Sequence, residues 1–192
     1  MRRLPLRSAS ILGGLLLTAA ATMVAVTAPA AAADTHGRLA KPSTAASTTY
    51  TEIINYKSSR CLSVRGGGTA NGTLTTIHSC ADLDDQNWRW GACNSLGFCN
   101  VVNKKSTKCL SVQGGSTVDG TPTTISDCVG HDDQRWAYLD CDPNHINCEL
   151  LNYKSVVFGP LRCLSVQGGS TVDGTPTTIH NCGNLDDQYW WF

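Results

Sequence analysis

Beyond residue 49, the apolar positions of the chain form short runs of β-branched and aromatic residues rather than a sustained helical period. Four of these runs are 51–54, 75–77, 88–90 and 100–102. Turn-forming pairs occur between such runs at Asn71-Gly72, Asp119-Gly120 and Asp173-Gly174. An Asn-Gly or Asp-Gly pair between two strand-like runs is a strong hairpin signal. Many short strands separated by regular turns therefore predict an all-β barrel or sandwich without a substantial helix.

The apolar pattern of the first 33 residues is of a different kind. Three arginines stand within the first seven positions, an apolar stretch of small residues runs from Ile11 to Val26, and Ala31-Ala32-Ala33 follows. A basic start, a short apolar core and a small-residue motif are the parts of a cleaved export signal. We therefore interpret residues 1–33 as a secretory signal peptide and expect a secreted, extracellular protein.

Residues 34–49 carry almost no large apolar side chains, so they cannot bury enough surface to order themselves and are interpreted as a flexible linker. Residues 50–192 then form one domain of ordinary size. The whole sequence has a formal net charge of +0; without the three signal arginines, 12 basic and 15 acidic residues leave −3. This balance argues against nucleic acid as a partner, because nucleic acid favours a basic face, and gives no support to binding at an anionic membrane.

One pattern occurs three times in this domain: Cys-Leu-Ser-Val, fifteen further residues, a second Cys, and then Asp-Asp-Gln-x-Trp. The three copies, called here repeats one, two and three, have their first Cys at Cys61, Cys109 and Cys163. Residues 109–125 and 163–179 are identical in sequence. A unit of this length cannot bury a core alone, so the repeats must supply each other's missing faces. Any function is therefore expected in up to three equivalent sites.

All ten cysteines follow residue 60, and an even number of cysteines in an exported domain predicts a disulfide framework. The two cysteines of each repeat are 19 residues apart, and two further pairs bracket short turn-like segments. No pair has Cys-x-x-Cys spacing and no histidine recurs at ligand distance, so neither a metal nor another cofactor is expected. The predicted disulfides are Cys61–Cys80, Cys93–Cys99, Cys109–Cys128, Cys141–Cys148 and Cys163–Cys182.

The spacing between corresponding residues is nearly the same in the three repeats. Asn55 and Asn103 each stand six residues before the first Cys of their repeat, whereas Asn152 stands eleven residues before Cys163. Repeat three therefore carries five extra residues within the apolar segment 156–161, and an apolar loop is expected to fold back over a barrel end. Because repeat three has only two residues after its Gln-x-Trp tryptophan, we expect the segment 50–56 to supply its missing strand.

Three copies in phase of Cys-Leu-x-Val, a second Cys and Gln-x-Trp resemble the ricin B-chain-type lectins over essentially all of residues 50–192. The resemblance implies a β-trefoil, which is a six-stranded barrel closed at one end by three hairpins. Closure agrees with the strand pattern, because it removes exposed sheet edges. The family fold would make the Gln-x-Trp tryptophans core residues and bond the glutamines to the backbone; these residues are Trp88, Trp136, Trp190, Gln86, Gln134 and Gln188.

The resemblance also implies a sugar pocket in each repeat, formed by the Asp of Cys-Leu-Asp-Val, an aromatic residue two positions before the second Cys, and an Asn before the Gln. This sequence departs from the family at all three positions. The first position holds Ser63, Ser111 and Ser165, the second His78, Ser126 and His180, and the third Asp85, Asp133 and Asp187. A hydroxyl accepts hydrogen bonds about half as strongly as a carboxylate, but the aspartates place a carboxylate on the opposite wall.

Histidine is the one residue at these positions with a flat ring for stacking, so repeats one and three are predicted to bind and repeat two to be weakest. If Asp85 and Asp187 hold imidazoliums, binding also depends on pH near 6–7, where an unperturbed histidine titrates. The predicted partner is a glycan or polysaccharide, bound by a monomer. The predicted carbohydrate-binding residues are Ser63, His78, Asp85 and Gln86; Ser111, Asp133 and Gln134; and Ser165, His180, Asp187 and Gln188.

Two other functions are compatible with the sequence. The apolar segment 156–161 favours a secreted protein-binding or inhibitory trefoil with degenerate sugar pockets. Ser63, His78 and Asp85 together suggest a catalytic triad, but Ser63 lies in a strand-like segment rather than at a Gly-flanked elbow, and repeat two lacks the histidine. The chain is therefore not expected to be an enzyme.

Overall fold

A computed structural model describes residues 47–142 and 146–192 as an antiparallel all-β domain. The predicted signal peptide 1–33 and the predicted linker as far as residue 46 lie outside the described residues. Ser47 already donates its backbone N–H to the carbonyl of Trp90, at 3.0 Å. Among the described residues, no helix is long and apolar enough to span a bilayer.

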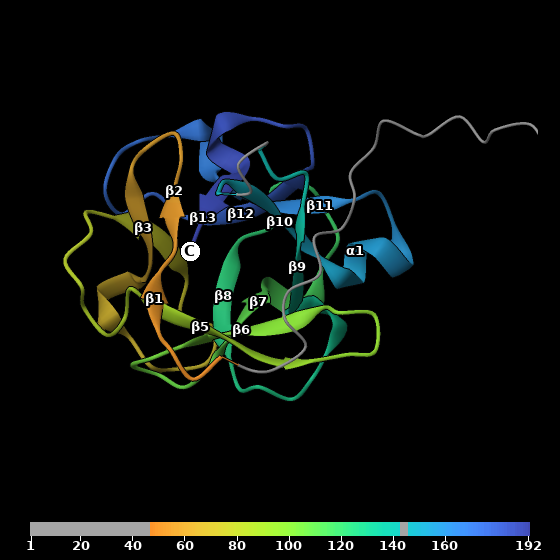
Figure 1. Ribbon diagram of the computed structural model, residues 1–192, viewed down its shortest axis with the longest axis horizontal. Coiled ribbons are helices and arrows are strands. Elements are labelled where there is room, and N and C mark those ends of the chain that lie inside the picture. The colour runs from red at the N-terminus through yellow and green to blue at the C-terminus, as the bar shows by residue number, and fades with distance from the viewer. Residues whose placement is uncertain (1–46, 143–145) are drawn as a thin grey trace, which may run out of the picture. The chain divides into compact units, whose positions relative to one another are not determined.

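The barrel of the domain is closed. Its strands pair in the order β1–β5–β6–β9–β10–β13–β2, and the consecutive short strands β1 and β2 occupy one strand position. Trp190 of β13 pairs with Asn55 of β2, so the segment 50–56 completes repeat three as predicted, and Figure 1 shows β13 beside β2. The barrel strands are β1 (Thr51–Glu52), β2 (Ile54–Asn55), β5 (Asn87–Cys93), β6 (Cys99–Asn103), β9 (Arg135–Leu139), β10 (Cys148–Asn152) and β13 (Tyr189–Trp191).

Each repeat adds one hairpin to the barrel. Isolated bridges join the hairpins of different repeats, for example between Thr76 and Pro176. The hairpin strands are β3 (Arg60–Val64) with β4 (Thr75–His78), β7 (Cys109–Val112) with β8 (Thr123–Ser126), and β11 (Arg162–Val166) with β12 (Thr177–Asn181). Short 3-10 turns are η1 (Arg65–Gly67), η2 (Gln113–Gly115), η3 (Asp132–Gln134), η4 (Gln167–Gly169) and η5 (Asp186–Gln188). This arrangement is the β-trefoil that the sequence predicted.

The Gln-x-Trp tryptophans lie in the centre of the core. Trp88, Trp136 and Trp190 are each 0% exposed. Their indole N–H groups donate to the backbone carbonyls of the Cys-Leu-Ser-Val leucines Leu62, Leu110 and Leu164, at 2.9, 3.0 and 3.0 Å. The prediction that these tryptophans are core residues is confirmed, and the indole bond joins the two sequence motifs of each repeat.

Two sets of side chains take one residue from each repeat. The fully buried hydroxyls of Thr75, Thr123 and Thr177 bond to one another in a ring, with oxygen–oxygen distances of 2.6–2.7 Å. The rings of Trp90, Tyr138 and Phe192, each two residues after a Gln-x-Trp tryptophan, pack together with centroids 5.0–5.9 Å apart. Both sets surround the pseudo-threefold axis, so no single repeat can complete either of them.

The five predicted disulfides are confirmed. One element was not predicted from the sequence: the extra residues of repeat three extend the helix α1 (Tyr153–Phe158). Ser155 of α1 is buried and accepts the backbone N–H of Arg162 at 2.9 Å, which fixes the helix to β11. Val156, Val157 and Phe158 remain 43, 46 and 65% exposed, so the segment does not bury its apolar side chains. Its folding over a barrel end stays a prediction.

The buried position of the repeat tryptophans predicts a large difference between two neighbouring residues. Trp190→Ala should lower the free energy of unfolding by about 3–5 kcal/mol, the range for a buried aromatic side chain. Trp191→Ala is the matched control, because Trp191 is 41% exposed. It should lower the free energy of unfolding by well under half as much. Guanidinium unfolding with the disulfides intact measures both values. Equal losses would contradict the assignment of Trp190 to the core.

Candidate functional site

Three equivalent surface hollows lie one at each repeat, with volumes of about 320, 360 and 420 Å³ in repeats one, two and three. We call them pockets one, two and three. Each is lined by the serine of Cys-Leu-Ser-Val, the second aspartate of Asp-Asp-Gln, two glycines of a 3-10 turn, and a threonine from the hairpin. These shared residues are Ser63, Asp85, Gly66, Gly67 and Thr76; Ser111, Asp133, Gly114, Gly115 and Thr124; and Ser165, Asp187, Gly168, Gly169 and Thr178.

The serine and the aspartate of each pocket are bonded to each other. The hydroxyl donates to carboxylate oxygen Oδ2 at 2.9 Å in pocket one and at 2.6 Å in pockets two and three. Both side chains are at least nine-tenths buried. The hydroxyl therefore fixes the carboxylate through Oδ2 and leaves its other oxygen, Oδ1, as an acceptor. Compared with the family pattern described above, the carboxylate has moved to the opposite wall of the pocket.

A lysine contributed by the next repeat along the closed barrel completes each pocket. Lys105 lines pocket one, Lys154 pocket two and Lys57 pocket three. Sequence reasoning missed these lysines, although the signal was present, since each stands two residues after an asparagine noted only for its spacing. The amides of Asn103, Asn152 and Asn55 donate to the carbonyls of Asp85, Asp133 and Asp187, at 3.0, 2.9 and 2.9 Å.

The lysine and the aspartate converge above a glycine whose backbone is left-handed. Gly115 has a φ of 62°, and a Cβ atom there would lie 2.8 Å from Lys154 Nζ and 3.4 Å from Asp133 Oδ1. At Gly169, with a φ of 60°, the corresponding distances are 2.7 Å to Lys57 Nζ and 3.4 Å to Asp187 Oδ1. A side chain at either glycine would be strained and would fill the space between the two charges.

The side-chain amide of each pocket glutamine bonds to the backbone through both its oxygen and its nitrogen. Gln86 donates to the carbonyl of Ser79 at 2.8 Å and accepts the N–H of Ala81 at 2.8 Å. Gln134 and Gln188 make the same two bonds around Cys128 and Cys182. The predicted backbone bonding of these glutamines is confirmed, and it fixes the loop beside each pocket. Direct contact of the glutamines with a ligand stays a prediction.

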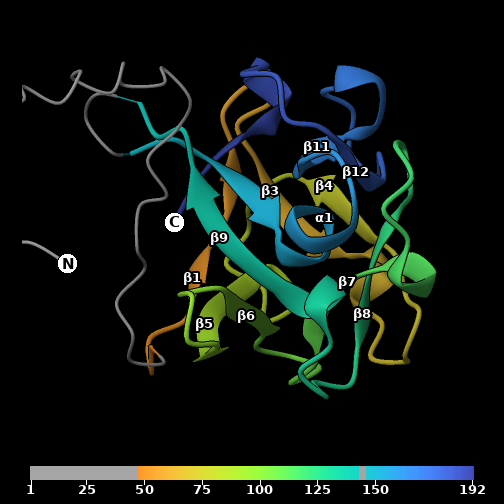
Figure 2. The same cartoon turned by 90° about the vertical axis from the view of Figure 1, so that its right-hand side faces the viewer.

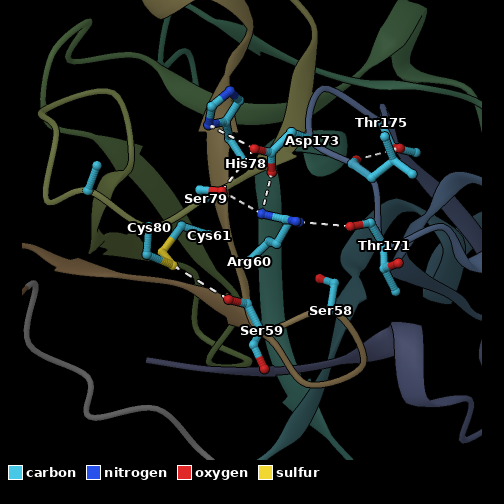
Figure 3. Close-up of polar contacts among 12 residues, drawn as sticks. Ser58, Ser59, Arg60, Cys61, His78, Ser79, Cys80, Thr171, Asp173 and Thr175 are labelled. Atoms are coloured by element: carbon cyan, nitrogen blue, oxygen red, sulfur yellow. Dashed lines mark hydrogen bonds and ion pairs between the residues drawn. A yellow bond between two sulfur atoms is a disulfide. The ribbon is translucent and has the colours of Figure 1, made fainter.

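The pocket histidines pair with aspartates other than those expected. His78 Nδ1 lies 3.8 Å from Asp173, whose carboxylate also binds Arg60 at 2.6 Å, as Figure 3 shows. His180 Nε2 lies 3.0 Å from Asp119. The imidazoles therefore pair with Asp173 and Asp119 rather than with Asp85 and Asp187. Asp119 and Asp173 belong to the turns of neighbouring repeats, so each imidazole bridges two repeats.

Pocket two has its imidazole on the other wall. Ser126 stands at the histidine position of the other repeats, but His131 lines the same pocket from the segment before η3. The equivalent residues in pockets one and three are Leu83 and Leu185, which are 52 and 49% exposed. The sequence signal for this difference was the residue directly before Asp-Asp-Gln, which is a histidine in repeat two and a leucine in repeats one and three. Each pocket thus offers an imidazole, and only pockets one and three add a leucine.

The geometry does not form a catalytic triad in repeat one. Ser63 donates directly to Asp85 at 2.9 Å, and no imidazole lies between them. His78 instead pairs with Asp173. A nucleophilic serine needs a base that takes its proton and a third group that orients the base. The structure places Ser63 as a fixed donor to a carboxylate, which suits a binding site.

A buried glutamate supports the loop that carries Leu185 into pocket three. Glu149 accepts the backbone N–H groups of Gly183 and Asn184 at 3.2 and 3.0 Å through Oε1. Its Oε2 is buried and has no hydrogen-bond partner among the described residues. Desolvation raises the pKa of Glu149, although the two backbone N–H groups act in the opposite direction.

A family model for the ricin-type beta-trefoil lectin domain matches residues 97–192, which is half of the chain. The chain belongs to this family, in agreement with its three Gln-x-Trp repeats and its trefoil fold. No curated protein matches the chain.

Solved structures show the same fold. The designed threefold-symmetric protein ThreeFoil has a TM-score of 0.67 and 26% identity, over 74% of this chain and 96% of that one. An exo-β-1,3-galactanase from Clostridium thermocellum has a TM-score of 0.69 and 22% identity, over 76% of this chain and only 30% of the enzyme. A ricin B-like lectin of Macrolepiota procera, solved with lactose, has a TM-score of 0.61 and 17% identity, over 78 and 97%.

The raised pKa of Glu149 predicts the sign of a pH effect on stability. A carboxyl whose pKa is higher in the folded state contributes stability below its ordinary pKa of about 4.3, and this contribution is lost as the pH rises through the folded value. Relative to the wild type, Glu149→Gln should therefore be more stable at pH 7 than at pH 3.

Urea unfolding at several pH values measures this effect. Glu52→Gln is the matched control, since the half-buried Glu52 accepts the equivalent backbone N–H from Asp82 at 2.9 Å. A Glu149→Gln variant that loses more stability at pH 7 than at pH 3 would show that the carboxylate is needed in its charged form.

Proposed function

We propose that this chain is a secreted carbohydrate-binding module, and that each pocket holds one sugar ring between its aspartate carboxylate and its lysine ammonium. The observation that carries the proposal is the threefold recurrence of one polar arrangement. The same serine-to-aspartate bond, the same asparagine anchor and the same lysine occur in all three repeats. The aspartate and the lysine come from different repeats each time, as with Asp85 and Lys105.

The chemistry of the pocket suits neighbouring hydroxyl groups of a sugar. One hydroxyl donates to the free Oδ1 of the aspartate, and the next accepts from the lysine ammonium. Hydrogen bonds with one charged partner are about twice as strong as neutral ones. Because the two charges have opposite signs, a neutral polyhydroxyl ligand matches the pocket better than an ion of either sign. The apolar face of the ring would lie against the imidazole, or against Leu83 or Leu185.

Known relatives suggest which sugars to test first. The ricin B-like lectin of Macrolepiota procera was solved with lactose, and the trefoil of Clostridium thermocellum belongs to a galactanase. Galactose-containing glycans are therefore our first candidates. Because this chain spans only 30% of the galactanase, the activity of that enzyme is not assigned to it.

We also propose that the chain is exported, with residues 1–33 as the signal, 34–49 as a linker and 50–192 as the binding domain. Ten cysteines joined in five disulfides support this proposal, because such bridges persist in oxidising compartments.

A protein-binding function is the second candidate, and one observation favours it. Val156, Val157, Phe158 and Leu161 are each at least 43% exposed, in and beside the insertion that only repeat three carries. A partner bound there would leave pockets one and three free, since neither is lined by a residue of α1. Protein binding that survives loss of all three pocket aspartates would support this alternative.

The sugar-binding proposal is tested by removing the pocket carboxylates. Asp85→Ala/Asp133→Ala/Asp187→Ala should weaken binding of galactose-containing glycans by about 10- to 100-fold, the loss of a hydrogen bond to a charged group in each pocket. The protein is taken from the culture medium, where it should begin at Asp34, and binding is measured by a glycan screen followed by calorimetry.

The chain contains a matched control for this variant. Each pocket aspartate follows a second aspartate, which is exposed in repeats one and three and half-buried in repeat two, so Asp84→Ala/Asp132→Ala/Asp186→Ala makes the same change of charge beside the pockets. This control should bind as the wild type does. Equal loss in both variants would place binding outside the pockets, and a wild type that binds no glycan would refute the proposed function.

A further inference from the structure

Among corresponding lining residues, pockets one and three differ in type at one position. Both pockets are lined by a serine, a valine, two glycines of a 3-10 turn, a threonine, a histidine, a leucine, an aspartate and a lysine at equivalent places. The residue directly after Cys-Leu-Ser-Val is Arg65 in pocket one and Gln167 in pocket three. Pocket two has Gln113 there. The three pockets thus provide an internal comparison in which an arginine replaces a glutamine.

The backbone geometry directs Arg65 to the pocket side of its hairpin. Val64, between Ser63 and Arg65, has an extended backbone and is 1% exposed in the core. Successive side chains of an extended segment point to opposite faces. Because Ser63 lines pocket one, exposed Arg65 points to the same side. Among residues 47–142 and 146–192, its guanidinium makes no hydrogen bond or ion pair, so it can bind a ligand.

The arginine changes the charge of pocket one. Apart from histidines, the charged lining residues of pockets two and three are one aspartate and one lysine each, which balance. Pocket one also contains such a pair, Asp85 and Lys105, and Arg65 adds a positive charge that no lining carboxylate balances.

A second substitution near pocket one acts in the same direction. Lys104, directly before the pocket lysine, pairs with Asp84 at 2.7 Å. Tyr153 and Tyr56 stand at this position before the lysines of pockets two and three. The aspartate that precedes the pocket aspartate therefore has this lysine partner only in repeat one.

The ion pairs between repeats do not alter the comparison. Strand β4 lies beside β12, as Figure 2 shows, and the turn before β12 brings Asp173 to Arg60, at 2.6 Å, next to pocket one. Pocket three has the equivalent pair of Asp119 and Arg162, which are 3.6 Å apart. Each pair joins one acid and one base, so the excess positive charge of pocket one comes from Arg65.

We propose that pocket one is selective for a sugar acid, and that its occupant is a galacturonic acid residue whose carboxylate binds the Arg65 guanidinium. Galacturonic acid is galactose with a carboxylate at C6, so it keeps the ring hydroxyls that would lie between Asp85 and Lys105. This inference rests on the proposed function and adds a selectivity that pockets two and three lack.

The chemistry of the guanidinium favours this occupant. Its planar fork matches a carboxylate through two parallel hydrogen bonds, which a glutamine amide cannot make with charge assistance. The aspartate and the lysine balance each other, so a ligand with one negative charge matches the excess charge of pocket one. A carboxylate attached directly to the ring lies close to the ring hydroxyls, just as Arg65 stands two residues from Ser63, which fixes Asp85.

The test compares three probes that differ only at C6: methyl galactoside, methyl galacturonoside, and the uncharged methyl ester of the latter. Asp133→Ala/Asp187→Ala isolates pocket one, and Asp85→Ala/Asp133→Ala isolates pocket three. In calorimetry at neutral pH and low salt, pocket one should bind the galacturonoside about fivefold more tightly than either neutral probe. Pocket three should show no such preference. In pocket one the preference should largely disappear at about 1 M salt, which screens exposed charges.

Exchange of the one differing residue assigns the preference to Arg65. With pocket one isolated, Arg65→Gln should reduce the preference to that of pocket three; with pocket three isolated, Gln167→Arg should create it. Arg65→Lys should keep part of the preference, because the charge remains but the fork is lost. Lys104→Tyr is the charge-matched control, since Lys104 does not line pocket one, and it should keep most of the preference. All three positions are exposed, so the variants should fold.

The outcomes distinguish this inference from the proposed function. Equal binding of the three probes in pocket one, or a preference unchanged by Arg65→Gln, would overturn the role of Arg65 and leave the proposed function intact. Equal losses in Arg65→Gln and Lys104→Tyr would contradict direct contact with Arg65. Tighter binding of methyl galactoside 6-sulfate than of the galacturonoside would overturn the choice of a carboxylate. If a glycan screen finds a ligand but none of these probes binds, the galacturonic acid proposal fails alone; if no glycan binds, both proposals fail.

Discussion

The bond from each core tryptophan to a leucine carbonyl is the interaction on which the rest of the structure depends. Trp88 donates to Leu62 at 2.9 Å. Leu62 precedes Ser63, and Trp88 follows Asp85 by three residues, so this single bond aligns the two motifs that form a pocket. A buried hydrogen bond contributes only about 1 kcal/mol net, but leaving the indole N–H unpaired would cost more. Because the bond recurs in all three repeats, the core and the pockets are specified together.

Threefold closure imposes the second constraint. The ring of three threonine hydroxyls and the cluster of Trp90, Tyr138 and Phe192 each need one residue from every repeat. The pockets share this dependence, since each takes its lysine from another repeat. Pocket three takes Lys57 because β2 pairs with β13. A fragment with one or two repeats would therefore lack both a closed core and a complete pocket.

Much of the fold was predictable from the sequence, because the repeats constrain one another. Equal spacing predicted three of the disulfides, and the turn-like segments between the other cysteines predicted the remaining two. The family resemblance implied the core tryptophans, and the alignment of the repeats predicted the closing strand. The side chains that line the pockets were harder to predict from the sequence, because each pocket joins residues of different repeats. His78 pairs with Asp173, which stands far later in the sequence. No local sequence pattern predicts such a contact. The helix α1 escaped prediction because it is short and lacks a helical period of its own.

The central claim is that sugars bind between the aspartate and the lysine of each pocket. A crystal structure of the protein with its tightest-binding glycan tests this claim most directly. The account predicts one sugar hydroxyl within about 3 Å of Asp85 Oδ1 and a neighbouring hydroxyl at a similar distance from Lys105 Nζ, with equivalent contacts in the other pockets. The Ser63–Asp85 bond should remain in place. A glycan bound elsewhere, for example in the hollow lined by Tyr56 and Tyr189, would contradict the account.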